Sequence, residues 1–298
     1  MLVGIFPNLS KENIVHHVDE LCHHLAVSGI DYRIWEQYRV EMDERDYHFA
    51  DERWADWASL IGKMDMAISL GGDGTLISVA KQIFPSQIPI VGVNLGDLGF
   101  LNTIERNNLD ERLQKIKAGA YHLVKRTVLN SVIITENGEP DEDFNLPLAV
   151  NEVVVGRSKP GKMARLRLYI NGAYVEEYPA DGIIIATATG STGYALSCGG
   201  PILYPGLDSL LVIPVCPHLL QSAPLLISRK DEVMITMPER EKQLYASIDG
   251  NESFHFNYGR QLIIKAHKET IPFVQFDDQN FFQSLFPKLS KSIYHAHF

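Results

Sequence analysis

The chain has 298 residues, of which 45% are hydrophobic and 21% charged, so it can bury a sizeable core. This composition, with 22 glycines and 15 prolines, excludes collagen, a coiled coil and a wholly disordered chain. The formal charge of −10 has the wrong sign for a protein that neutralises nucleic-acid phosphates, so we expect no nucleic-acid partner. At this length two domains are expected.

The first third of the chain alternates strand and helix patterns. Short apolar runs predict strands at residues 2–6, 32–35, 66–70 and 88–93. Between them, apolar residues recur at three- and four-residue spacing, which predicts helices from near Ile14 and near Leu76. Apolar strands separated by helices pair in parallel, so we expect a doubly wound α/β domain over residues 1–120.

From about residue 121 the apolar period changes to two, which is typical of half-buried β-strands. Strand patterns follow at residues 123–129, 131–135, 153–155, 166–175, 183–186, 210–215, 233–237 and 262–265. Asn171-Gly172 predicts a tight hairpin inside the fourth of these. We therefore expect a β-rich domain over residues 121–275.

Neither the cysteines nor the histidines indicate a protein-bound metal. The three cysteines are Cys22, Cys198 and Cys216. They lie far apart and form no Cys-x-x-Cys pair, which favours free thiols in a reducing compartment. The histidines of the first predicted helix lie off its apolar stripe and are expected on a solvated face. The first residues carry no basic segment, and their apolar run is too short for a signal peptide. No run of about eighteen apolar residues occurs, so we expect a cytoplasmic protein without a membrane partner.

The sharpest feature is Gly71-Gly72-Asp73-Gly74-Thr75, between a predicted strand and the second predicted helix. Glycines at such a turn bring backbone N–H groups against a ligand, and a helix N-terminus favours phosphate, which makes Gly71, Gly72 and Thr75 candidate phosphate-binding residues. Asp73 would be repelled by phosphate unless it holds a metal ion or faces a hydroxyl that loses its proton. The alternative is a structural turn in which Asp73 or Thr75 caps the helix.

A second glycine loop, which contains Gly96, Gly99 and Phe100, follows the next predicted strand. Because successive parallel strands end at the same edge of a sheet, both glycine loops should lie at one carboxyl edge, where such folds bind ligands. Phe100 is a candidate for stacking on a base, and simple packing beside a glycine is the alternative.

Two polar stretches of the β-rich half are further candidates for ligand recognition. Asn151 and Glu152 precede an apolar run, and an amide beside a carboxylate suits the hydroxyls of a ribose, although a solvated strand end is the alternative. Residues 187–200 bring many hydroxyls and glycines after another apolar run. A flat heterocycle can approach such a backbone closely, and a Ser/Thr-rich turn into a short helix is the alternative.

Together and in this order, the motifs closely resemble those of the NAD kinase family. The similarity covers residues 65–250 and includes Val215-Cys-Pro-His218. The Gly-Gly-Asp-Gly-Thr element is shared with diacylglycerol, sphingosine and 6-phosphofructokinases, so the Asn-Glu pair and the Thr-Gly-Ser-Thr loop are the discriminating features. The closing residues are similar to the family's C-terminal segment, which implies that residues 276–298 pack back on the first domain.

The resemblance implies phosphoryl transfer from ATP to the 2′-hydroxyl of the adenosine ribose of NAD, giving NADP, with Mg²⁺ or another divalent cation. Some family members use inorganic polyphosphate as the donor. A homodimer or homotetramer that shares sites between subunits is implied as well. Two alternatives stay open: a lipid or sphingoid-base kinase with the same glycine element, and a dinucleotide-binding sensor without turnover.

The resemblance also implies roles for single residues. Asp73 is the implied base at the 2′-hydroxyl, and Gly74 lies beside it. Asn151 and Glu152 are implied to bind the ribose, with Phe100 on the adenosine half. The other implied contacts are Asp181 on the nicotinamide half and Thr192, Gly193, Tyr194 and Ser197 around the bases.

The chain departs from the family's motifs at six positions, which are Asp97, Pro179, Ala188, Gly193, Cys198 and Ala223. Pro179 and Ala223 stand where members usually carry a basic residue, and Asp97 stands where they carry a basic or neutral one. Fewer cations weaken the case for binding a polyphosphate donor, so we expect ATP to be the donor.

Overall fold

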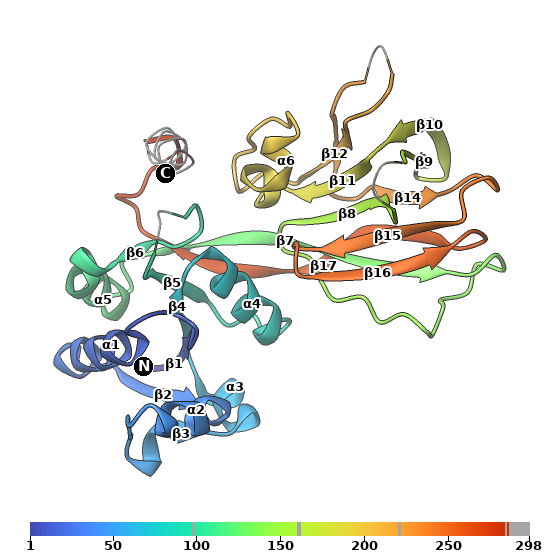
Figure 1. The fold of residues 1–298 in the computed structure, drawn as a ribbon. Coiled ribbons are helices and arrows are strands. Elements are labelled where there is room, and N and C mark those ends of the chain that lie inside the picture. The colour runs from blue at the N-terminus through green and yellow to red at the C-terminus, as the bar shows by residue number, and fades with distance from the viewer. Residues whose placement is uncertain (97–98, 160–161, 220–221, 284, 286–298) are drawn as a thin grey trace. The chain divides into compact units, whose positions relative to one another are not determined.

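The computed structural model describes residues 1–96, 99–159, 162–219, 222–283 and 285 (Figure 1). The chain divides into two compact units, the first made of Met1–Lys125 with the residues from Ile271 on, and the second of Arg126–Thr270. The sequence analysis placed these boundaries after residues 120 and 275, so at each boundary the first unit includes a few more residues than expected. Most of the predicted C-terminal segment, residues 286–298, lies outside the described residues.

The first unit is built on a parallel sheet with the strand order β17-β5-β4-β1-β2-β3 and with β6 beside β5. Its strands are β1 (Leu2–Pro7), β2 (Asp31–Trp35), β3 (Trp54–Ala55), β4 (Met66–Gly71), β5 (Ile90–Asn94), β6 (Ile104–Glu105) and the end of β17 (Gln261–Gln275). Its helices are α1 (Ile14–Ser28), α2 (Arg39–Glu44), α3 (Trp57–Lys63), α4 (Asp73–Ile83) and α5 (Leu109–Lys117), with 3-10 turns at Glu36–Tyr38, Asp51–Arg53 and Arg106–Asn108.

Helices cover both faces of this sheet. Val3 and Ile5 of β1 share a buried core with α1 and α5. Because alternate strand residues face opposite sides, Gly4 faces the other side, beside Leu60 of α3. Gly92 of β5 faces this second side too, against α4. The prediction of a doubly wound α/β fold is thus confirmed.

The second unit consists of two sheets. Its strands are β7 (His122–Ile134), β8 (Glu152–Arg157), β9 (Ala164–Ile170), β10 (Ala173–Ala180), β11 (Gly182–Thr187), β12 (Ser209–Val215), β13 (Leu225–Ser228), β14 (Glu232–Thr236), β15 (Gln243–Ile248), β16 (Glu252–Asn257) and the first part of β17. One sheet has the order β13-β12-β11-β8-β15-β16, and the other has β10-β9-β14-β17 with β7 also on β17. A 3-10 turn (Gly190–Thr192) and α6 (Tyr194–Ser197) follow β11.

The period-two pattern builds the core of the second unit. Val153 and Val155 of β8 face a buried cluster with residues of β9, β11, β14 and β17. Val154 faces the other side of the six-stranded sheet, in a smaller cluster with Ala195 of α6. The predicted hairpin is present between β9 and β10, with positive φ at Asn171 (50°) and Gly172 (77°).

Other elements differ from the sequence-based expectations. The two strands predicted over residues 123–135 form the single strand β7, which ends at Ile134, because Asn130 sits at an exposed position and does not break the pairing. The short helices α2, α3 and α5 and the strands β13, β15 and β16 were not predicted. The apolar residues of α5 and β15 do recur regularly, at Leu109, Leu113 and Ile116 and at Leu244, Ala246 and Ile248, so a signal for these two elements was present and was missed.

The chain closes the core of the first unit with residues from its far end. Val274 and Phe276 belong to the same buried cluster as β1 and α1. The guanidinium of Arg112 in α5 lies over the Phe276 ring, 4.7 Å from its centroid, and Nη1 donates to Asp278 Oδ1 (2.6 Å). A cation over an aromatic face, tied to a carboxylate, anchors this segment beside α5.

We expect Phe276→Ala to lower the stability of the first unit by about 3–5 kcal/mol, because it empties a fully buried ring position. Amide hydrogen exchange followed by mass spectrometry should become faster in β1, β4 and β5 and stay unchanged in β8 and β11. Phe282→Ala is the matched control, since the Phe282 ring is 59% exposed. Equal protection of β4 in the two variants would contradict this packing.

Candidate functional site

The first unit has a switch point at β1, where the chain changes the side on which it adds strands. β2 and β3 lie on one side of β1, and β4 and β5 lie on the other. Doubly wound sheets bind ligands at the carboxyl ends of the strands that flank such a point, here Pro7 of β1 and Gly71 of β4. Asn8 links the two ends, because its side chain donates to Thr75 Oγ1 (2.9 Å) and its backbone N–H donates to Leu70 O (2.9 Å).

Residues 71–75 form the turn from β4 into α4. Gly72 is the N-cap, and the helix begins at Asp73. The positions where a Cβ would stand on Gly72 and Gly74 are open, so a ligand can approach the backbone of the first helical turn, whose dipole favours an anion. At Gly71 a Cβ would collide with the Thr75 side chain, which gives Gly71 a packing role.

The carboxylate of Asp73 is bound to the loop after β5. Oδ2 accepts from Phe100 N (2.6 Å) and Leu101 N (3.2 Å), while Oδ1 accepts from the backbone N (3.3 Å) and Nδ2 (2.8 Å) of Asn102. A Cβ at Gly99 would collide with this carboxylate, so the close approach requires glycine there. The two predicted glycine loops thus meet at one sheet edge. Asp97 lies outside the described residues.

In the second unit, Asp249 organises the backbone around the Asn-Glu pair. It lies in the turn between β15 and β16 with a positive φ of 49°. Its carboxylate accepts from three successive N–H groups, those of Val150 (3.0 Å), Asn151 (2.8 Å) and Glu152 (3.2 Å). The sequence analysis missed Asp249. The only local signal was an Asp-Gly pair after a strand-like run, which by itself predicts a turn.

Glu152 is a buried carboxyl group that lacks a full set of partners. Its residue is 6% exposed, and Oε2 has no hydrogen-bond partner among the described residues. Burial, together with the smaller effect of the nearby Asp249 charge, raises the pKa of Glu152 to about 7. Such a perturbed carboxyl group, with a free acceptor, is typical of a binding or catalytic position.

The loop after β11 packs directly on the Asn-Glu pair. A Cβ at Gly190 would collide with the carbonyl of Asn151, and a Cβ at Gly193 would lie 3.2 Å from Glu152 Oε2. Glycine at position 193 therefore leaves space beside the unpartnered oxygen of Glu152, and an alanine at this position would narrow that space. The structure thus brings Asn151, Glu152 and Gly193 together, as one group within the second unit.

Several hydroxyls of this loop hold its own backbone. Thr187 Oγ1 donates to Val150 O (2.6 Å) and accepts from Gly190 N (3.1 Å). Thr192 Oγ1 donates to Thr189 O (3.3 Å). Tyr194 is 46% exposed, and Ser197 is exposed as well, so the side chains open to a ligand lie at the start and end of α6.

Asp181 lies at the opposite end of the strands from the Asn-Glu pair. β8 and β11 are antiparallel, with Glu152 opposite Ala186 and Gly156 opposite Gly182. Asp181 forms an ion pair with Arg157, the last residue of β8 (2.9 Å). At about 3.4 Å per residue, it is separated from Glu152 by about 17 Å along the strand direction. Asp181 is the one predicted second-unit residue that the structure places far from the others.

The described residues contain no group of three or more His, Cys, Asp or Glu side chains that could hold a metal ion. Mg²⁺ commonly needs only one or two protein carboxylates when it arrives on substrate phosphates. Asp73, at a turn that is open to phosphate, suits that chemistry. Within the described ranges, no helix has the length and apolar character to cross a membrane.

Comparison with known proteins finds matches along both halves of the chain. The family model for the ATP-NAD kinase N-terminal domain matches residues 3–121, and that for the ATP-NAD kinase C-terminal domain matches residues 150–276. The NAD kinase of Caldanaerobacter subterraneus subsp. tengcongensis is 34% identical over 290 residues, covering 97% of this chain and 99% of the relative. That of Syntrophotalea carbinolica is 37% identical over 287 residues, covering 96% and 97%.

Two solved structures share the fold. Yeast NADH kinase complexed with NADH has a TM-score of 0.83 at 20% identity, covering 100% of this chain and 89% of that one. An NAD kinase from Archaeoglobus fulgidus in complex with ATP has a TM-score of 0.74 at 24% identity, covering 97% and 99%. At these identities the likeness supports the fold, an α/β unit combined with a β-rich unit.

The raised pKa of Glu152 makes stability depend on pH. Between its ordinary value of 4.5 and its folded value of about 7, the unfolded chain has lost a proton that the folded protein keeps. The free energy of unfolding therefore falls as pH rises through this range, by about 3 kcal/mol for this group. Glu152→Gln should abolish that fall, as measured by denaturant titration at pH 5 and pH 7.5. The matched control Glu239→Gln, at an exposed position, should retain it.

Proposed function

Since the chain belongs to the NAD kinase family, we propose that it transfers the γ-phosphate of ATP to the 2′-hydroxyl of the adenosine ribose of NAD, forming NADP. The observation that carries this proposal is the similarity to curated NAD kinases over nearly the whole chain. The position of the Gly71–Thr75 turn at the switch point of the first unit supports it. The two related structures are complexes with NADH and with ATP, which represent the two substrate classes of the proposed reaction, a nicotinamide dinucleotide and a nucleoside triphosphate.

We propose that the glycine turn binds the phosphates of the donor. Gly72, Gly74 and Thr75 offer the N–H groups of the first turn of α4, where the helix dipole favours negative charge. Gly71 supports the turn by its close packing on Thr75. Mg²⁺ or another divalent cation would arrive on ATP, held by the phosphate oxygens, and would neutralise phosphate charge, which leaves Asp73 for the substrate hydroxyl.

In the transfer step, the 2′-oxygen bonds to the γ-phosphorus while the bond from that phosphorus to the β–γ bridging oxygen breaks. ADP leaves with the electron pair, and Asp73 is proposed to accept the hydroxyl proton. A carboxylate has about four acceptor positions, and four donors from residues 100–102 already point at this one. The substrate hydroxyl must therefore replace one of these donors. Phosphoryl transfer passes through a loose transition state, in which the attacking oxygen gains little charge. Positioning of the substrates therefore contributes more to the rate than removal of the proton.

The second unit is proposed to bind the adenosine half of NAD. The free Oε2 of Glu152 suits a ribose hydroxyl, and Asn151 can donate and accept beside it. The residues proposed around the bases are Thr192, Gly193, Tyr194 and Ser197, with Phe100 of the first unit on the adenosine. Because a carboxylate accepts from a hydroxyl best when ionised, NAD binding should strengthen as pH rises through the Glu152 pKa of about 7.

Asp181 is proposed to meet the nicotinamide half. Its distance from Glu152 along the strands suits a homodimer or homotetramer in which one subunit completes the site of another, and we propose such an assembly. The described cysteines are all free thiols, which fits a reducing compartment, and we place the enzyme in the cytoplasm.

ATP is proposed as the donor in preference to polyphosphate. Pro179 lacks the basic side chain usual in the family, and its cross-strand neighbour is Arg165. That guanidinium is paired with Glu177 (3.3 Å), which also binds Arg167 and Arg240. Arg165 is therefore not a free replacement for the missing charge, while Ala223 offers none.

The direct test is incubation of purified protein with Mg²⁺, ATP and NAD, coupled to an NADP-specific dehydrogenase. NADP should accumulate with ATP, and turnover with polyphosphate should be at least about tenfold slower at matched magnesium. Equal turnover with both donors would contradict the donor assignment. Phosphorylation of a diacylglycerol instead of NAD, or NAD binding by calorimetry without NADP formation, would overturn the proposed reaction.

Replacing the carboxylate of Asp73 should impair catalysis more than binding. We expect Asp73→Asn to lower kcat by about 10²-fold or more, because the amide cannot accept the hydroxyl proton. The matched control is Asn102→Ala, which removes one donor to the carboxylate but leaves the carboxylate in place, and its kcat should stay within a few fold of the parent. A raised KM for NAD with unchanged kcat in Asp73→Asn would show that Asp73 only binds.

A further inference from the structure

The second unit contains a cavity of about 320 Å³ that the proposed reaction does not use. It lies between the turn that joins β13 to β14 and the middle of β17. Four basic side chains line it, those of Arg229, Lys230, Lys265 and Lys268, against the carboxylates of Asp208 and Asp231. The whole chain has a formal charge of −10, so a local cluster of four cations is opposite in sign to the net charge of the protein.

The walls of this cavity are held by hydrogen bonds. The Nη2 atom of Arg229 donates to the backbone carbonyls of His267 (2.8 Å) and Lys268 (3.2 Å), which ties the turn to β17. Glu232 of β14 stands directly opposite Lys265 of β17, and the two side chains form an ion pair (2.5 Å). The backbone that carries the cations is thus fixed before any ligand arrives.

Two of the cations have unused donors. The ammonium groups of Lys230 and Lys268 have no hydrogen-bond or ion-pair partner among the described residues. The carboxylates are less available to oppose an anion. Asp231 accepts from Ser228 N and from the side chain of Asn171 (2.8 Å each). Asp208, whose side chain is 84% exposed to solvent, forms an ion pair with Arg229 (3.8 Å).

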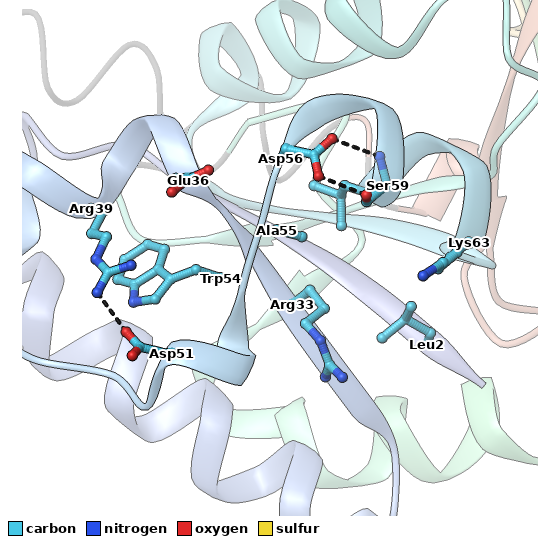
Figure 2. A pocket seen from close by; sticks show the side chains of 11 residues that line it. Leu2, Arg33, Glu36, Arg39, Asp51, Trp54, Ala55, Asp56, Ser59 and Lys63 are labelled. Carbon is cyan, nitrogen blue, oxygen red and sulfur yellow. Dashed lines mark hydrogen bonds and ion pairs between the residues drawn. The ribbon is translucent and has the colours of Figure 1, made fainter.

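A larger cavity in the first unit shows what a balanced lining looks like (Figure 2). Its volume is about 410 Å³, and three basic side chains face three carboxylates there. Arg39 donates to Asp51 (2.6 Å), which pairs one cation of this cavity with one carboxylate, and Asp56 accepts from Ser59 N (3.0 Å). This cavity therefore favours neither an anionic nor a cationic ligand, which distinguishes it from the cavity beside β17.

We propose that the cavity lined by Arg229, Lys230 and Lys268 binds a short phosphate chain, of the size of a di- or triphosphate. Lysine ammonium groups bind phosphate as point charges with three donors each, and unpaired ones at a fixed backbone suit a compact polyanion. The volume lies at the small end of ligand sites, so the phosphate chain is recognised and any attached nucleoside remains outside. This inference concerns binding alone and does not rest on the proposed kinase activity.

The test is protection from acetylation by a lysine-reactive reagent, followed by mass spectrometry of the full chain. Inorganic tripolyphosphate should slow the modification of Lys230 and Lys268 several-fold and leave that of Lys242 unchanged, since Lys242 lies outside the cavity. The protection should weaken as salt is raised. Unchanged modification of Lys230 and Lys268 would overturn the proposal. Protection by ATP at tenfold lower concentration than by tripolyphosphate would overturn the assignment to the phosphate chain alone.

Calorimetric titration with tripolyphosphate provides a second measurement. The double variant Lys230→Ala, Lys268→Ala should bind at least about tenfold more weakly than the parent protein. The matched control Lys162→Ala, Lys242→Ala makes the same change in net charge at exposed positions outside the cavity and should bind within about twofold of the parent. Equal weakening in both double variants would show a net-charge effect and would overturn the site.

Discussion

In each unit, the candidate residues are organised by one aspartate whose carboxylate accepts hydrogen bonds from three successive backbone N–H groups. Asp73 gathers those of residues 100–102, and Asp249 gathers those of residues 150–152. A carboxylate held this way replaces water as the acceptor for buried amides, so removing it would leave several donors unpaired at once. The loops that carry the site residues take their shape from these two side chains.

The same arrangement accounts for the unusual state of Glu152. The backbone N–H of Glu152 donates to Asp249, so the carboxyl group of Glu152 is held close to a second negative charge and away from solvent. A protein that used position 152 only for packing would gain from an apolar side chain there. The retained carboxyl group with a free oxygen is instead understandable as an acceptor reserved for a ligand, with a cost in stability near neutral pH.

Sequence reasoning succeeded where the signal was local. The Gly71–Thr75 turn and the hairpin at Asn171-Gly172 follow from residues that are adjacent in the chain. It did not reach features whose information lies in register or in distant partners. The partners of Asp249 are 97 to 99 positions away, and the separation of Asp181 from Glu152 follows from the antiparallel pairing of β8 with β11. Neither spacing nor composition encodes such pairings.

The return of the chain to the first unit has a consequence for its biosynthesis. Met1–Lys125 leaves the ribosome first, yet the core of that unit also needs Val274 and Phe276, and the strand that pairs with β5 through Phe273 comes last. Until the intervening residues have been translated, the nascent unit keeps an unfilled apolar position and an open strand edge. The first-made half of the chain can therefore complete its core and cover its strand edge only after the last-made half has emerged.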